Sequence, residues 1–281
     1  MQPEIELGPL TLQTFGLCLA VAFLACGVLV GQRLRELGKP VDWAYEVVLA
    51  AFAGGIVGAR IDYLVQNSAA FEADPVGATF GGTGLVFFGG LVGGIGGVGL
   101  WARRRRFVSW QLADIAGAAV ALGYAIGRVG CQVSGDGDYG EPSDLPWAMS
   151  YPEGTVPTDV EVHPTPVYES LLMGIAALVL WRLRDRVRPG TIFALYLLIA
   201  GVERFLVEFI RRNDPALLGL TVAQLFAVLS AAAGTALLLV RRGALTPSRP
   251  AAPPPPAPTP RSRPGGRDRA GRSGGRRRSR R

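Results

Sequence analysis

The residues most able to do chemistry are arginines and carboxylates that lie within strongly apolar stretches. Arg204, Glu208 and Arg211 are spaced i, i+4 and i+7, which would place them on one face of a helix, where Glu208 can bridge both arginines. An arginine side chain presents a planar fork of N–H donors that suits a phosphate group. The spacing predicts either a binding site for an anionic head group or a structural stripe of ion pairs that holds helices together.

Further polar and ionisable residues lie near the ends of other apolar stretches. They are Arg60, Asp62, Arg128, His163, Tyr168, Glu169 and Glu203. A charged side chain inside a bilayer is costly and is a functional hypothesis by default. With the orientation given below, these groups share one depth, so we expect one polar cavity that opens outward or sideways. Arginines and carboxylates are equal in number, so the shape of the guanidinium, not net charge, favours the phosphate of an anionic phospholipid.

The elements that must position these side chains are long and apolar. The chain has 281 residues, 49% of them hydrophobic, and a mean hydropathy of +0.29, which argues against a soluble domain. A stretch of about 20 apolar residues can span a bilayer, and a helix satisfies its own backbone there. We therefore predict an all-α, polytopic membrane protein. Its seven predicted spans cover roughly residues 10–31, 44–66, 84–101, 109–128, 165–182, 191–211 and 219–240.

Basic residues in the short connections indicate the orientation. The connections after the first, third and fifth spans contain several Lys or Arg residues, whereas those after the second and fourth contain none. By the positive-inside rule, the N-terminus lies outside, the C-terminus lies in the cytoplasm, and residues 129–163 form an outer loop. Residues 1–9 contain two glutamates and no Lys or Arg, so we expect the first span to be a retained helix, not a cleaved signal.

The end of the chain differs in composition from the rest. Residues 241–281 carry 13 arginines and one aspartate, whereas residues 1–240 carry 16 basic and 21 acidic residues. The Pro-rich and then Arg/Gly/Ser-rich composition of this end cannot bury enough apolar surface to fold. We expect a membrane domain over residues 1–242 and a disordered cytoplasmic tail over residues 243–281. The tail's arginines are expected to bind anionic lipid, not nucleic acid.

Metal binding has little support in the sequence. Cys18, Cys26 and Cys131 follow no spacing typical of a zinc site. Gly135 to Asp138 is typical of a tight turn, whereas a calcium loop would need more ligands at regular spacing. We expect no metal site.

Four motifs follow one another in a characteristic order. Gly127-Arg128-Val129-Gly130-Cys131 is followed by Tyr139-Gly140, then by His163-Pro164-Thr165-Pro166-Val167-Tyr168-Glu169, and then by Glu203-Arg204 through Glu208 to Arg211. Together these motifs resemble those of the prolipoprotein diacylglyceryl transferase family. The resemblance extends over roughly residues 8–240 and excludes the tail.

The resemblance implies an activity and a location. The implied reaction transfers the diacylglyceryl group of phosphatidylglycerol to the lipobox cysteine thiol in a prolipoprotein signal peptide, and it releases glycerol phosphate. Both substrates reside in the membrane lipid bilayer. We expect a multi-pass protein of the bacterial plasma (inner) membrane that acts as a monomer and needs no cofactor.

The resemblance also implies roles for individual residues. Arg128 matches the family's head-group-binding arginine, and Arg204 matches a second essential arginine, with Glu208 and Arg211 as its orienting partners. The candidate catalytic residues are Arg128, Arg204 and His163. The candidate substrate-binding residues are Arg128, Arg60, Gly130, Gly140, Tyr168, Glu169, Glu208 and Arg211.

Three positions depart from the family pattern. Phe88 stands where the family usually has a histidine often proposed as the base, Cys131 stands where an asparagine is usual, and Phe15 stands where a tyrosine is commoner. His163 is the only histidine, and its simpler interpretation is a residue at the start of a helix whose ring hydrogen-bonds the loop. The base is left open among several groups. They are His163, Glu169 and Glu208.

Other functions were weighed against this one. A divergent homologue would bind anionic phospholipid but act on another acceptor or be inactive, which Phe88 motivates. A channel or transporter for an anionic solute is disfavoured, because charge confined to one half of the membrane leaves no conduction path. A retinal-type receptor is excluded, because the sole lysine, Lys39, lies in a predicted loop.

Overall fold

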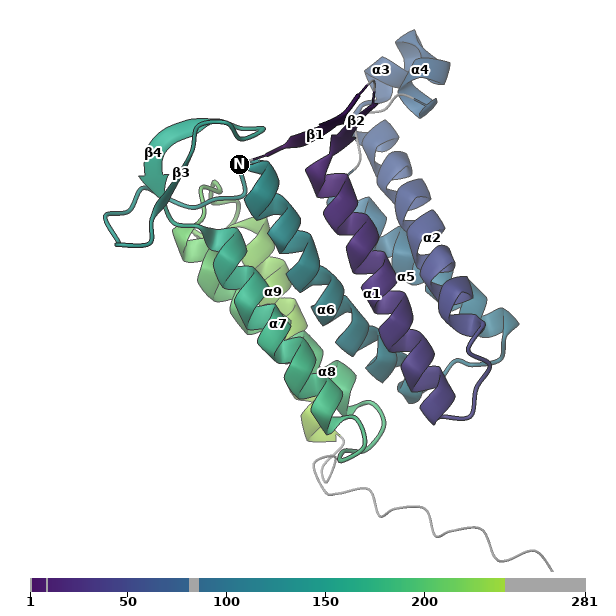
Figure 1. Cartoon of the computed structure of the whole chain (residues 1–281). Helices are drawn as coiled ribbons and strands as arrows, with labels where there is room; N and C mark the ends of the chain where they lie inside the picture. The colour runs from purple at the N-terminus through teal and green to yellow at the C-terminus, as the bar shows by residue number, and fades with distance from the viewer. Residues whose placement is uncertain (1, 9, 81–85, 241–281) are drawn as a thin grey trace, which may run out of the picture. The chain divides into compact units, whose positions relative to one another are not determined.

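The computed structural model describes residues 2–8, 10–80 and 86–240, where the chain is mostly helical (Figure 1). The predicted tail over residues 243–281 lies outside these residues. Among the described residues, five helices are long and apolar enough to cross a membrane. They are α1 (Thr14–Glu36), α2 (Trp43–Gln66), α6 (Trp110–Ser134), α7 (Thr165–Leu183) and α9 (Val222–Val240).

The third and sixth predicted spans are helical too, as α5 (Phe87–Arg104) and α8 (Thr191–Val207). Neither is among the five long apolar helices. α5 is rich in glycine and ends in two arginines, and α8 has only 17 residues, two of them charged. Length and composition therefore mark five of the seven predicted spans as membrane-crossing.

The prediction of an all-α protein is incomplete, because two small antiparallel hairpins are present. β1 (Glu4–Leu7) pairs with β2 (Leu10–Gln13), so α1 begins at Thr14 and not at residue 10. Gly8, with a φ of 64°, supplies the left-handed backbone that the tight connection needs. β3 (Met149–Tyr151) pairs with β4 (Thr158–Val162) inside the predicted outer loop.

The ends of two predicted spans also lie elsewhere. α6 continues past Arg128 to Ser134, where Gly135 caps it in the left-handed region at a φ of 59°. Arg128 therefore lies inside a helix, one and a half turns before its end, and not at its last residue. α8 ends at Val207, and a 3-10 turn, η1 (Glu208–Ile210), replaces the predicted α-helix before Arg211.

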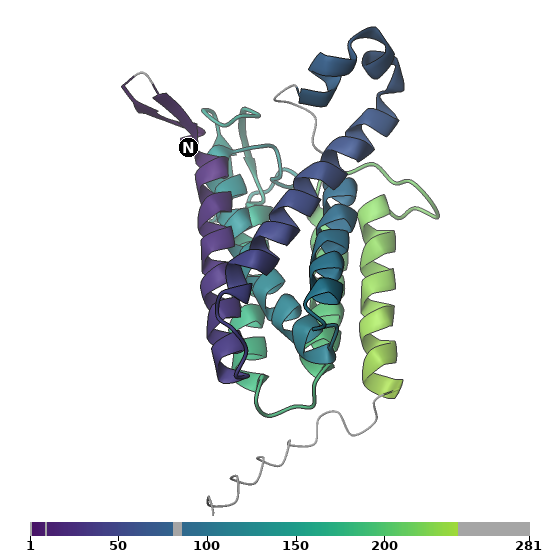
Figure 2. The ribbon, with the colours of Figure 1, turned by 90° about the vertical axis from the view of Figure 1, so that its right-hand side faces the viewer.

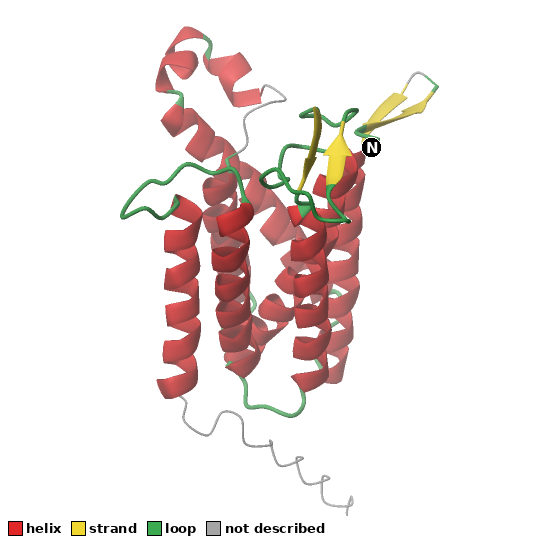
Figure 3. Ribbon diagram, turned by 90° about the vertical axis from the view of Figure 1, so that its left-hand side faces the viewer, coloured by secondary structure: helices red, strands yellow, loops and turns green. Residues whose placement is uncertain are grey.

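The helices pack in two groups, which contact each other both at the end away from the β3–β4 hairpin and through Phe88 of α5 (Phe87–Arg104) and Phe226 of α9. α6 contacts α1, α7 and α8, and α9 packs on α8 (Figures 1 and 3). α2 and α5 form a second, closely packed pair, and α2 crosses the other helices obliquely in Figure 2. A Cβ added to Gly93 of α5 would lie 2.2 Å from the carbonyl oxygen of Gly54, so only glycine permits this approach.

We call the end of the bundle that carries β3–β4 the hairpin end, and the other the opposite end. At the opposite end, an aromatic core of Trp43, Trp101 and Phe107 joins α2 and α5 to buried Leu34 of α1 and Ile115 of α6. At the hairpin end, two short helices, α3 (Ser68–Ala73) and α4 (Pro75–Phe80), follow α2 (Figure 1). The two ends are thus built differently, with apolar packing at one and polar loops at the other.

Candidate active site

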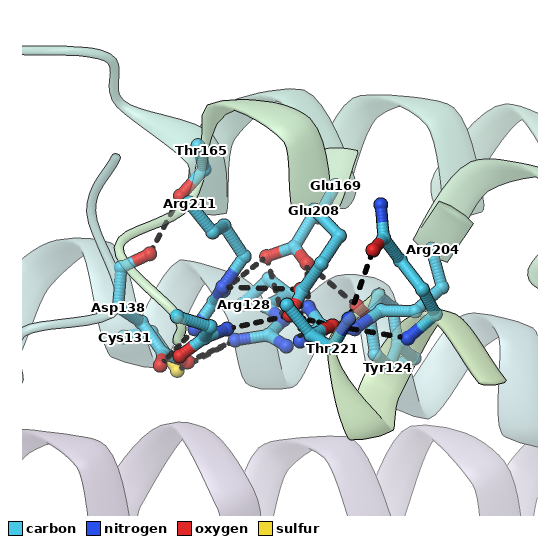
Figure 4. Close-up of polar contacts among 12 residues, drawn as sticks. Tyr124, Arg128, Cys131, Asp138, Thr165, Glu169, Arg204, Glu208, Arg211 and Thr221 are labelled. Atoms are coloured by element: carbon cyan, nitrogen blue, oxygen red, sulfur yellow. Dashed lines mark hydrogen bonds and ion pairs between the residues drawn. The ribbon is translucent and has the colours of Figure 1, made fainter. Parts of the chain in front are cut away.

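Glu169 is the centre of a buried ion-pair cluster at the hairpin end (Figure 4). It lies in the second turn of α7, and its side chain is 0% exposed. Its carboxylate accepts contacts from Arg128 Nε at 2.9 Å, Arg204 Nη1 at 3.0 Å and Arg211 Nη1 at 3.5 Å. One carboxylate therefore holds three guanidinium groups that come from two helices and the turn after α8.

Tyr124 of α6 contacts both Glu169 and Arg128. Its hydroxyl donates a hydrogen bond to Glu169 Oε1 at 3.0 Å, and its ring lies 4.9 Å from the guanidinium carbon of Arg128. Tyr124 precedes Arg128 by four residues, which places both on one face of α6. Tyr124 was not among the predicted site residues, although its spacing from Arg128 was a usable signal.

Asp138 reaches the cluster from the loop after α6. It pairs with Arg128, and it accepts a hydrogen bond from Arg211 Nη2 at 2.5 Å. The Thr165 hydroxyl donates to the Asp138 carbonyl, also at 2.5 Å, and so ties the loop to the start of α7. Burial alone would raise the pKa of Asp138, but the two guanidinium groups outweigh burial and hold its pKa below the ordinary value.

Glu208 is the third carboxylate of the cluster, in the first position of η1. Its Oε2 lies 2.7 Å from Arg204 Nη2 and 4.0 Å from Arg211 Nε, so it does bridge both arginines as predicted. Its Oε1 accepts hydrogen bonds from Thr221 Oγ1 at 2.7 Å and Asn213 Nδ2 at 2.8 Å. Thr221 and Asn213 were missed, because nothing in their local sequence marks them as partners.

Three guanidinium groups thus face three carboxylates in a region largely removed from solvent. Breaking such a buried pair by removing one partner costs about 3–5 kcal/mol, because a charge is left uncompensated. The arginines are not equally covered: the exposed side-chain fraction is 24% for Arg204, 15% for Arg128 and 9% for Arg211. Arg204 and Arg128 are therefore the two that an incoming anion can reach most easily.

His163 and Tyr168 lie beside the cluster and contact each other. His163 Nδ1 is 3.4 Å from the Tyr168 hydroxyl, which also accepts a hydrogen bond from Trp147 Nε1 at 2.7 Å. The main chain of His163 pairs with the loop, because its carbonyl accepts from the Gly140 amide at 2.9 Å. Within the described residues, no hydrogen bond or ion pair joins the His163 ring to the three arginines or three carboxylates.

The two candidate glycines serve close contacts between backbones. A Cβ on Gly140 would lie 2.3 Å from the Ile210 carbonyl oxygen, where the loop meets the turn that carries Arg211. A Cβ on Gly130 would lie 2.9 Å from Cβ of Cys18, on α1. Any side chain at either position would push apart elements that place Arg128 and Arg211.

The structure does not bring Arg60 into the cluster. Arg60 Nε donates to the Thr79 carbonyl at 2.8 Å, and its guanidinium lies 5.1 Å from the Tyr63 ring centroid, so these contacts lie on the α2–α4 side. Phe88, at the position of the family histidine, contacts the Phe226 ring of α9 with centroids 4.7 Å apart. Residues at the same predicted depth in the membrane therefore need not belong to one site.

Cys131 stands next to the head-group arginine expected from the motif. Its Sγ lies 3.8 Å from Arg128 Nη1, and Cys131, Asp136 and Asp138 each offer one potential metal-ligand atom within 4.8 Å of the others. Two guanidinium groups contact the same Asp138 carboxylate, and a cation there would compete with both. We assign no metal to this group.

Comparison with known proteins identifies the family. The sequence profile of prolipoprotein diacylglyceryl transferase matches residues 3–240. The chain is 36% identical to the phosphatidylglycerol–prolipoprotein diacylglyceryl transferase of Chromohalobacter salexigens over 248 residues, 85% of this chain and 91% of the relative. It is 34% identical to that of Methylibium petroleiphilum (83% and 93% covered) and 30% identical to that of Clostridium tetani (76% and 87% covered). The resemblance inferred from the motifs is confirmed, and the chain belongs to the prolipoprotein diacylglyceryl transferase family.

Proposed function

We propose that this protein transfers the diacylglyceryl group of phosphatidylglycerol to the lipobox cysteine of a prolipoprotein and releases glycerol phosphate. The names of its relatives state both substrates, and the profile match covers nearly all of the described chain. The observation that carries the proposal is the buried cluster around Glu169, in which two of three arginines are partly accessible. A phosphodiester is the ligand whose charge and shape suit these donors.

Arg128 and Arg204 are proposed to bind the phosphate. Among the described residues, the contacts of Arg204 use Nη1 and Nη2 but not Nε, and Arg204 is the most exposed of the three arginines. Asp138 comes from a loop and is more exposed than Glu169 or Glu208, so it is the carboxylate that an anionic head group most readily displaces. Glu169 and Glu208 would then keep the guanidinium groups oriented during the reaction.

The reaction needs positive charge more than it needs a nucleophile from the enzyme. The acceptor sulfur attacks a glyceryl carbon, the bond from this carbon to the phosphate oxygen breaks, and charge accumulates on the departing phosphate. Guanidinium groups that are already in place stabilise that charge without reorganisation, which is the main source of catalysis in such sites. Arg211, Gly130, Gly140 and Tyr168 are proposed to shape the site around them.

The membrane arrangement is proposed from charge patterning. We infer seven spans, with α5 and α8 crossing as part of the packed bundle, the hairpin end outside and the C-terminus in the cytoplasm. The site would then open to the outer half of a bacterial plasma membrane, where lipid and signal peptide both arrive. A monomeric membrane domain over residues 1–242 and a separate cytoplasmic tail remain part of this proposal.

Complementation tests the proposal. A bacterium depleted of its own transferase is supplied with the wild-type chain or with the Arg128→Ala variant, and lipoprotein mobility on gels is read. Rescue by the wild-type chain alone is the expected result. Failure of a well-expressed, membrane-inserted wild-type chain would contradict transfer to prolipoproteins, and retained phosphatidylglycerol binding would then indicate another acceptor.

A further inference from the structure

One buried carboxyl group has no place in the ion-pair cluster. Glu203 of α8 is 7% exposed, and its Oε1 has no hydrogen-bond partner among the described residues. No ion pair engages it within that part of the chain. By contrast, Glu169 contacts three arginines and Glu208 contacts two. Among the described residues, Glu203 is therefore the one buried glutamate near the site that forms no ion pair with an arginine.

Glu203 faces the neighbouring helices. Tyr196 and Ile199, seven and four residues earlier on α8, pack on the core that α6 and α7 form, and Glu203 continues that face. Its charge interacts with Glu169 on α7 and with Arg128 on α6. Glu203 thus lies beside the cluster, on its protein side.

The charged and titratable groups around Glu203 come from every helix packed on α8 but one. α6 contributes Tyr124 and Arg128, and α7 contributes Glu169. α8 and the segment after it contribute Tyr196, Arg204 and Arg211. α9 contributes none, because Val222–Val240 contains no titratable side chain. The three arginines of the cluster already form ion pairs with Asp138, Glu169 and Glu208. Glu203 is an additional carboxyl group outside these ion pairs.

A buried carboxyl group without an ion-pair partner lowers the stability of the fold. Burying a charge without a partner costs far more than burying a paired one, and an ionisable residue within a membrane helix is by default a functional one. An alanine or leucine at this position would pack the same face without that cost. The observation calls for a chemical role.

The proposed transfer leaves one chemical need unmet. The acceptor thiol must lose a proton, and a thiol at neutral pH is mostly protonated. The arginines cannot accept a proton, and the carboxylates of Asp138, Glu169 and Glu208 are already paired with guanidinium groups. The ring of His163, the only histidine, is engaged with Tyr168.

We propose that Glu203 accepts the proton of the acceptor thiol, an inference that rests on the proposed function. The S–H bond breaks and its proton passes to the Glu203 carboxylate, while sulfur forms a bond to the glyceryl carbon. The carbon–oxygen bond to phosphate breaks, and its electron pair leaves with glycerol phosphate. Product release and exchange with water return the proton to solvent.

The test compares wild-type protein with Glu203→Gln and Glu203→Asp in phosphatidylglycerol vesicles, with a lipobox peptide as acceptor. For Glu203→Gln we expect kcat to fall about 10²–10³-fold, as for loss of a general base, and KM for phosphatidylglycerol to stay within about twofold. The acid limb of the kcat–pH profile should disappear in Glu203→Gln and persist in Glu203→Asp. Glu72→Gln, an amide substitution at an exposed site on α3, is the matched control.

A second acceptor separates proton transfer from a structural role. A peptide with selenocysteine in place of the lipobox cysteine is already ionised at neutral pH, so it should restore most of the rate of Glu203→Gln. Retention of kcat within about threefold in Glu203→Gln, or a large loss that selenocysteine does not relieve, would overturn the proposal. Wild-type protein without transfer activity would instead contradict the proposed function itself. If Glu203→Gln does not fold, Glu203→Leu takes its place, and an acid limb and a kcat identical to those of wild type in that variant would overturn the proposal equally.

Discussion

The two ends of the bundle both carry arginine–carboxylate pairs, but they use them differently. At the opposite end, Arg33 Nη1 lies 2.7 Å from Glu36 and 2.6 Å from Asp185, and Arg184 Nη2 lies 2.9 Å from Glu36. These distances are no longer than those around Glu169, which are 2.9, 3.0 and 3.5 Å. The carboxylates differ, because Asp185 is 61% exposed and Glu36 is 29% exposed, whereas Glu169 is fully buried.

This difference in burial decides what each set of pairs can do. Water screens the pairs at the opposite end, so each contributes about 0–1 kcal/mol to stability. Arg33 lies in the last turn of α1 and Arg184 directly follows α7, and both count toward the basic residues on which the proposed orientation rests. Removing the pairs at the hairpin end from water costs free energy. Their preorganised guanidinium groups can, however, stabilise an anion whose charge develops beside them.

The largest effect should come from the most exposed arginine of the cluster, Arg204. We expect Arg204→Ala to lower transfer in phosphatidylglycerol vesicles about 10²–10³-fold, because it removes donors to the phosphate and leaves Glu208 short of a partner. Arg204→Lys keeps the charge but loses the fork, so it should recover only part of the rate. Full activity in Arg204→Ala would assign this pair a purely structural role, like those at the opposite end.

Neutralising the central carboxylate should cost stability. Glu169→Gln leaves Arg128, Arg204 and Arg211 without their shared partner, and we expect a loss of about 3 kcal/mol in the free energy of unfolding. Asp185→Asn at the opposite end is the matched control, with an expected loss of at most about 1 kcal/mol. Denaturant unfolding in detergent measures both. Equal losses would erase the distinction between the two ends.

Acid should weaken the hairpin end through Asp138. Its pKa is held below the ordinary value by Arg128 and Arg211, so its contribution to stability is present above the unfolded-state pKa, near 3.9, and is lost as pH falls through the folded-state value. We expect the difference in thermal midpoint between wild type and Asp138→Asn to be constant from pH 7 to about 5. It should shrink below pH 4. A difference that grows in acid would show that the arginines do not hold Asp138 as an anion.

The smallest effect should come from the exposed pairs. Arg184→Gln removes contacts to Glu36 and Asp185, and we expect a change of at most about 1 kcal/mol in stability and an unchanged transfer rate. Raising the salt concentration should reduce even this stability difference. A tenfold loss of transfer in Arg184→Gln would mean that the two ends are coupled.

The helices and the order of the motifs could be predicted from the sequence, because hydropathy and spacing are local properties. The bridge from Glu208 to Arg204 and Arg211 was also predicted, and it forms although the α-helix ends at Val207. The 3-10 turn keeps the side chains close enough for the same contacts. Local patterns therefore indicated most of the charged side chains that meet in the cluster, but not Asp138.

Partners that come from distant parts of the chain could not be predicted. Asp138 was interpreted as part of a turn, because only the folded loop brings it to Arg211, 73 residues later. Arg60 was placed in the same cavity, because hydropathy gives depth but not the direction in which a side chain points around the bundle. Its contacts with Tyr63 of α2 and Thr79 of α4 depend on how α4 packs on α2, which depth alone does not determine.

The buried arginines at the hairpin end are proposed to bind the lipid phosphate during transfer. The most direct test measures the mass increase of a lipobox peptide in phosphatidylglycerol vesicles with wild-type protein, Arg128→Ala and the opposite-end variant Arg33→Ala. We expect wild type and Arg33→Ala to lipidate the peptide at similar rates, and Arg128→Ala, folded by the same detergent assay, to be at least about 10²-fold slower. A rate for Arg128→Ala within threefold of wild type would contradict this proposal.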